Sequence, residues 1–143
     1  MTATGVARPH SQILRFAGTG LIATVAAMAA TTAAAALART AGADFAIPDG
    51  GETIPLAGFA VVTGFFSAVG VVIAVALLRR SARPAERFVW TAGLLTAISL
   101  VPPLISGANA ATVTALIVLH GVAAAVMIPV LALGLRRRAD QRG

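Results

Sequence analysis

The sequence predicts an all-α protein in which four helices cross a membrane as a bundle, with both termini on the same side. Three observations lead to this prediction. Hydrophobic residues make up 58% of the chain and charged residues only 11%, whereas soluble domains carry about 25% charged residues. Four apolar stretches are long enough to cross a bilayer and contain no Asp, Glu, Lys or Arg. Arginines gather in the segments that would lie on one side of these stretches.

The predicted helices belong to a single membrane domain, residues 1–143. At about 1.5 Å per residue, each is close to the length that the hydrocarbon core requires. Their ranges are about 16–38, 56–78, 88–106 and 113–135. The predicted connections are an outer loop (39–55), a cytoplasmic loop (79–87), and a cytoplasmic tail (136–143).

The first stretch also has features of a secretory signal, because Arg15 precedes it and Ala36-Leu37-Ala38 has the form of a cleavage site. The apolar region of a signal peptide is about 7–15 residues long, and this stretch is longer. We therefore expect an uncleaved membrane helix here.

The arginines predict the orientation. Ten of the eleven basic residues flank the ends that share a side with the two termini, and Arg39 is the exception. The outer loop instead carries three acids, Asp44, Asp49 and Glu52. Because basic residues concentrate on the cytoplasmic side, the sequence predicts an inner-membrane protein with both termini in the cytoplasm.

The composition excludes several function classes. Cys is absent, which excludes disulfides, thiolate catalysis and Cys-ligated metal centres. The net charge of +6 could indicate a nucleic-acid partner, but the arginines flank membrane spans, Tyr is absent and Trp occurs once. We expect the lipid bilayer as the main partner, no nucleic acid and no cofactor.

Small and weakly polar residues recur at helical spacing and predict packing seams, because small side chains let helices approach each other in lipid. The seam predicted on the second span consists of Ala60, Thr63, Ser67, Gly70 and Ala74. The first span carries a similar stripe that contains Gly20, Thr24, Ala27 and Thr31. Helix ends or kinks are expected at Pro102 and Pro103 and within the fourth span at Pro129.

One polar layer is expected in the outer half of the membrane, about 9–11 Å from the outer interface. It consists of Thr32, Thr63, Ser99 and His120 and could line a pocket open to the outside. His120 is the one ionisable residue within the predicted spans, and such residues are candidates for function. It could hydrogen-bond neutrally and fasten helices, or serve as a proton relay or ligand contact; too few fixed ligands accompany it for a metal site.

Several short motifs resemble those of an uncharacterised family of small actinobacterial four-helix membrane proteins. They are the sequence Ile-Pro-Leu-Ala-Gly-Phe-Ala at 54–60, Leu-Val-Pro-Pro-Leu at 100–104, Leu119-His120 and Ile128-Pro129. The resemblance extends over 46–135. It implies four spans and no activity, and it makes Pro103, His120 and Pro129 the more distinctive positions.

Three function classes remain compatible with these features. The favoured one is a non-catalytic accessory protein or self-associating helical bundle, with a second copy or another membrane protein as partner. The alternative is a small transporter or channel subunit with an outward-facing polar pocket around His120, although the spans lack the carboxylate that small proton-coupled antiporters use. A membrane enzyme is least favoured, because no catalytic constellation can be assembled within the spans.

Overall fold

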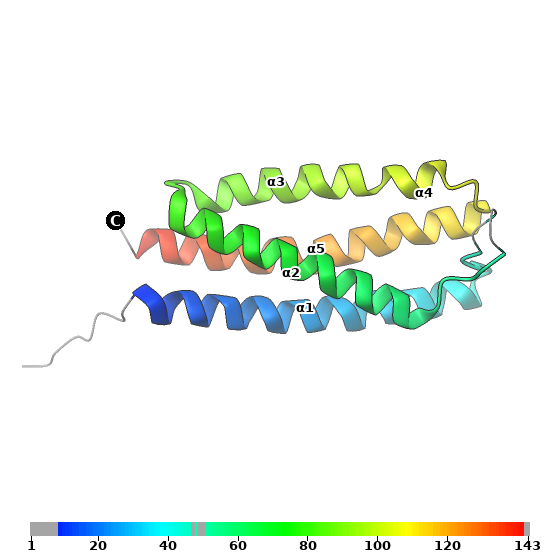
Figure 1. The fold of residues 1–143 in the computed structure, drawn as a ribbon, viewed down its shortest axis with the longest axis horizontal. Helices are drawn as coiled ribbons and strands as arrows, with labels where there is room; N and C mark the ends of the chain where they lie inside the picture. The colour runs from blue at the N-terminus through cyan, green and yellow to red at the C-terminus, as the bar shows by residue number, and fades with distance from the viewer. Residues whose placement is uncertain (1–8, 47, 49–50, 142–143) are drawn as a thin grey trace, which may run out of the picture.

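The computed structural model describes residues 9–46, 48 and 51–141, and its elements are helices that run along one common axis (Figure 1). The helices are α1 (Pro9–Thr40), α2 (Leu56–Arg80), α3 (Pro84–Ser99), α4 (Val101–Ile105) and α5 (Ala110–Asp140). Since α3 and α4 together form one apolar span, Pro84–Ile105, four helices are long and apolar enough to cross a membrane. The predicted all-α four-helix bundle is confirmed.

The helices pack as a four-membered bundle with α1 and α3 at opposite corners. Each of these two helices contacts both α2 and α5, and they do not touch each other in the part of the chain that the structure describes. Figure 1 shows α2 crossing the bundle obliquely, near α3 at one end and near α1 at the other. The start of α1, the end of α5 and the α2–α3 connection lie at the same end.

The helices extend beyond the predicted apolar spans. α1 begins at Pro9 and continues to Thr40, which shortens the predicted outer loop, and α5 continues through most of the predicted tail to Asp140. α3 begins at Pro84, where a proline is well tolerated because the first turn needs no N–H partner. Apolar composition marks only the segment suited to hydrocarbon, whereas a helix continues into the interface where water satisfies its end groups.

The prolines have different effects in the two spans. α3 ends at Ser99, and α4 begins at Val101 with prolines in its first turn, so the third span is interrupted and restarts. Pro102 and Pro103 have no backbone N–H group, and the first turn of a helix does not need one. Pro129 lies inside the continuous helix α5, where it removes the N–H that would otherwise bond the carbonyl of Ala125.

The interior consists of two apolar clusters, one toward each end of the bundle. The cluster at the arginine-rich end includes Phe16, Leu78, Phe88, Leu131 and Leu135. The cluster at the other end consists of Ala35, Ala43, Phe45, Ala115 and Leu119. Together they draw on every membrane-spanning helix.

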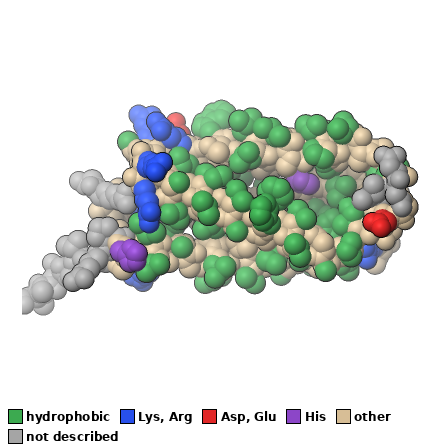
Figure 2. Space-filling view, viewed as in Figure 1, with side chains coloured by type: hydrophobic (Ala, Val, Ile, Leu, Met, Phe, Trp, Pro, Cys, Tyr) green, Lys and Arg blue, Asp and Glu red, His purple; other side chains and the backbone are tan. Residues whose placement is uncertain are grey.

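Large apolar side chains also cover the outside. Phe65 is 64% exposed, Trp90 77% and Ile105 78%. Figure 2 shows hydrophobic side chains covering the middle of the bundle, with most basic side chains gathered at one end. Because soluble monomers rarely expose such a continuous apolar surface, the four apolar helices suggest a membrane protein in contact with lipid.

Of the helix pairs in the described chain, α1 and α2 make the most extensive contact. The stripe of small residues expected on α1 lies on its buried face, where a Cβ added at Gly20 would stand 2.7 Å from Cγ2 of Val71. On α2, a Cβ at Gly64 would stand 2.9 Å from the sulfur of Met28. Such approaches require the absence of a side chain.

The seam predicted on α2 is only partly buried. Ser67 and Ala74 are buried, Ala60 and Thr63 are half-buried, and a Cβ added at Gly70 would meet no atom within 4 Å. The close backbone approach expected at Gly70 is therefore not observed in the described chain. The tight contacts of this interface are instead those of Gly64 with the Met28 side chain and of Gly20 with the Val71 side chain.

Gly20→Ala should lower the free energy of unfolding by about 1–3 kcal/mol, the usual result of overpacking. The reason is that the stiff, branched Val71 must move to admit the methyl group. Thermal unfolding in detergent measures the effect. Gly18→Ala is the matched control, because its added Cβ meets nothing within 4 Å on the same helix. Equal loss in both variants would contradict the observed α1–α2 interface.

Candidate functional site

The predicted outer polar layer makes one hydrogen bond between helices. Thr63 of α2 lies 3.0 Å, hydroxyl to hydroxyl, from Thr31 of α1. Thr31 is buried, and its hydroxyl is also 2.9 Å from the Ala27 carbonyl. The neighbouring Thr32, which the sequence pattern placed in the layer, donates instead to the carbonyl of Met28 at 2.7 Å. Thr31 therefore occupies the position predicted for Thr32.

His120 is half-buried in α5 and bonds to its own helix. Its Nδ1 lies 2.7 Å from the carbonyl oxygen of Leu116, one turn earlier. Because a carbonyl can only accept, Nδ1 carries a proton, and in the neutral ring Nε2 is then the acceptor.

The four layer residues are not joined to one another by the hydrogen bonds of the described chain. Like Thr32 and His120, Ser99 bonds to its own helix, with its hydroxyl donating to the Thr96 carbonyl at 2.7 Å. Hydroxyls in an apolar medium use the carbonyls of the preceding turn when no other partner is present. Three of the four layer residues thus bond within their own helices, and the described residues contain no group of three potential metal-ligating acids, His or Cys.

A second polar cluster fixes the α1–α2 loop to the start of α5, and we call it the outer latch because it lies at the end that the sequence predicts to face outward. The latch consists of Asp44, Phe45, Asn109 and Thr112. The Thr112 hydroxyl donates to Asp44 Oδ1 at 2.8 Å and accepts from the Phe45 N–H at 3.1 Å. The side chain of Asn109 caps α5 by accepting from the Thr112 N–H at 2.7 Å.

Phe45 supplies the apolar contacts of the outer latch. Its backbone has φ +52°, a conformation that bulky residues rarely adopt, and its side chain is fully buried. The ring packs edge-to-face against Phe59 with centroids 4.7 Å apart. Such a backbone costs about 1–3 kcal/mol and persists where surrounding contacts hold it.

The α1–α2 loop packs onto the end of the bundle where the sequence predicts an opening. Its residues Ala43 and Phe45 are buried in a cluster with Ala115 and Leu119 of α5. Arg39 reinforces this packing by donating to the Ile54 carbonyl at 2.6 Å. Apolar side chains of the α1–α2 loop are therefore packed at the end of the bundle where the sequence predicts an opening.

The outer latch favours the charged form of Asp44. The Ala46 N–H, at 3.1 Å from Oδ1, is the largest cause of a pKa below the ordinary value of 3.8, and the Thr112 hydroxyl is the second. Both groups donate to the carboxylate and are less well matched to the protonated acid. Asp44 thus accepts both of these hydrogen bonds when it is ionised.

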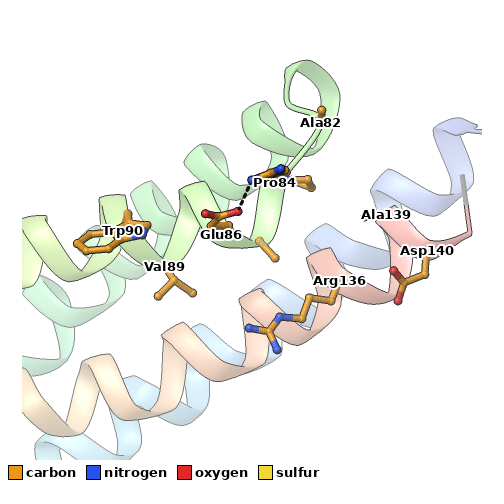
Figure 3. Close-up of a pocket in the computed structure, with 10 residues that line it drawn as sticks. Ala82, Pro84, Glu86, Val89, Trp90, Arg136, Ala139 and Asp140 are labelled. Carbon is orange, nitrogen blue, oxygen red and sulfur yellow. Dashed lines mark ion pairs between the residues drawn. The ribbon is translucent and has the colours of Figure 1, made fainter. Parts of the chain in front are cut away.

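A groove lies at the opposite, arginine-rich end, between the first turns of α3 and the last turns of α5 (Figure 3). Its volume is about 350 Å³. Arg83 and Glu86 form an exposed ion pair at 3.6 Å along one side, and Arg136 extends from α5. The sequence patterns did not predict this groove, although Trp90 in a segment rich in arginines is a typical interfacial signal.

A family model described as "Family of unknown function (DUF6069)" matches residues 12–137. The chain belongs to this family. The match confirms the resemblance to an uncharacterised family that the sequence motifs indicated, and it assigns no activity. Comparison with curated proteins and with solved structures gives no match.

The outer latch predicts an acid-dependent loss of stability. The pKa of Asp44 is depressed by folding, so its stabilising contribution is present above the unfolded value and is lost as the pH falls through the folded value. The wild-type melting temperature should therefore fall below about pH 4 by more than that of Asp44→Asn, measured in detergent by circular dichroism.

Glu52→Gln is the control for this measurement, because Glu52 is an exposed acid of the same loop outside the latch. It should keep the wild-type pH dependence. If Asp44→Asn shows the same dependence as the wild type, the latch does not contribute to stability.

Proposed function

We propose that the protein is a non-catalytic, multi-pass protein of the bacterial inner membrane that acts as an accessory subunit or a self-associating helical bundle. Both termini lie in the cytoplasm in this proposal. The observation that carries it is the use of the polar side chains within the spans. They hold the bundle together or bond to their own helices, as Thr31, Thr63 and His120 illustrate.

The satisfaction of these groups supports a structural role. Among the described residues, each buried side-chain nitrogen or oxygen has a hydrogen-bond partner. Catalytic sites tend to keep polar or ionisable groups poised in a cleft with perturbed environments. Here a hydrogen bond between the side chains of two membrane-spanning helices joins two threonines, which suits fastening.

The orientation is supported by charge. The two ends of the bundle differ, with most arginines at the end that holds the start of α1 and the end of α5. Basic residues near membrane spans are retained on the cytoplasmic side during insertion. The outer latch would then face the periplasm or the exterior.

One observation favours the alternative of a small transporter or channel subunit. His120 is a half-buried ionisable residue in the first half of the membrane-spanning helix α5, and such residues often mark pathways. The packing of Ala43 and Phe45 against Ala115 and Leu119 at the predicted outer end weighs against this alternative.

The two functions differ in their tolerance of His120→Gln. A structural role requires only a hydrogen-bonding side chain, and such bonds in membranes average about 0.6 kcal/mol. In a strain from which the gene is deleted, His120→Gln should therefore complement the deletion as well as the wild-type gene does, at equal protein abundance in the membrane fraction.

Gly20→Ala serves as the control that lowers stability without changing polar chemistry, so its phenotype should follow the amount of folded protein. If His120→Gln accumulates to wild-type levels yet fails to complement the deletion, the proposed role is wrong and the transporter alternative is favoured.

Accessibility of single cysteines tests the orientation and the packing at the outer end together, without background because the chain has no Cys. Ala41→Cys should react with a membrane-impermeant thiol reagent in intact cells, whereas Ala82→Cys should react only after lysis; both alanines are exposed. His120→Cys should stay unreactive from outside, because the α1–α2 loop packs against α5 at the predicted outer end. Reaction of Ala82→Cys in intact cells would reverse the orientation, and reaction of His120→Cys would show an open outer route.

A further inference from the structure

The groove between α3 and α5 joins a charged surface to an apolar one. The charged part of the groove is lined by Arg83, Glu86 and Asp140. The part next to the apolar span is lined by Val89 and Trp90 (Figure 3). Its volume of about 350 Å³ could hold a small polar headgroup. The two walls come from segments that are distant in sequence, so the groove exists only in the assembled bundle.

The groove lies at the depth of lipid headgroups. α3 begins at Pro84, and its apolar span follows the first turn directly, so the groove is at the boundary between charged and apolar residues. Trp90 is 77% exposed there, and tryptophan is enriched at the interface between hydrocarbon and water. A molecule seated in the groove would therefore place its polar part near Arg136 and its apolar part along Val89 and Trp90.

The charges favour an anion. Within the groove, Arg83 is already paired with Glu86 at 3.6 Å. Arg136 lines the groove from α5, with its side chain directed away from Asp140, and forms no ion pair with the described residues. The surrounding end is strongly basic, with arginines at 79, 80, 87, 137 and 138 in addition. Such a field attracts anionic groups near the membrane surface.

We propose that this groove binds the headgroup of an anionic phospholipid of the surrounding bilayer. Arg136 contacts the phosphate, and the acyl chains run along the apolar face of α3 beside Val89 and Trp90. A second groove of about 470 Å³ lies on the other side of α3 and shares Arg83, Glu86 and Trp90, but it is lined by Arg87 and not by Arg136. This difference allows the two grooves to be tested separately.

Trp90 is the only tryptophan of the chain, so its fluorescence reports on this region alone. The protein is reconstituted into phosphatidylcholine vesicles that contain, at equal mole fraction, either phosphatidylglycerol or phosphatidylcholine with acyl chains brominated near the headgroup. Bromine quenches tryptophan on contact. The wild type should be quenched more strongly by brominated phosphatidylglycerol, and high salt should reduce the difference because it screens charge.

Arg136→Gln should reduce the preference for phosphatidylglycerol about fivefold, the factor that corresponds to about 1 kcal/mol per arginine at an anionic surface. Arg137→Gln removes the same charge at the same end but lies outside both grooves, and Arg87→Gln removes it from the second groove. Both controls should keep most of the preference. Circular dichroism melting of each variant confirms that the bundle remains folded.

Equal quenching of the wild type by the two brominated lipids would overturn the proposal. An equal loss in Arg136→Gln and Arg137→Gln would also overturn it, because only the general field of the basic end would then act. A selective loss in Arg87→Gln would move the lipid to the second groove and likewise contradict the assignment to Arg136.

Discussion

The structure depends on one property of its solvent: hydrocarbon offers no hydrogen-bond partner. Each backbone N–H and carbonyl within a span must therefore be satisfied inside the protein, which makes the helix the only open-chain solution. The same constraint acts on side chains. Thr32, Ser99 and His120 each bond to a carbonyl of their own preceding turn, and Thr31 reaches a second helix while also bonding to its own.

Because lipid is as apolar as the helix surfaces, packing in this bundle relies on close approach instead of hydrophobic burial. Close approaches occur between α1 and α2, where Gly20 faces Val71 and Gly64 faces Met28, and between α1 and α5, where Gly134 faces Phe16. α3 is the least buried span and contacts only α2, α4 and α5 among the described helices. Its basic end is consequently the one that leaves grooves open to the membrane interface.

The spans and their number could be predicted from the sequence because they depend on local composition and length. Side-chain direction was harder. Consecutive residues of a helix point about 100° apart, so a depth estimate placed Thr32 in the polar layer when Thr31 faces α2. Gly70 shows the same limitation, since spacing identified a stripe of small residues but not which of its members meets another helix. The outer latch and the α3–α5 groove could not be predicted, because both join residues far apart in the chain.

The outer latch has a consequence for the order of biogenesis. Its two halves, Asp44 and Thr112, are separated by 68 positions, and Thr112 lies at the start of the last membrane-spanning helix. Chains are synthesised and generally fold from the N-terminus onward. The first two helices can therefore insert and pair while the loop between them is still unfastened, and the left-handed backbone of Phe45 gains its supporting contacts only when α5 arrives. Closure of this loop thus requires that the start of α5 has been synthesised.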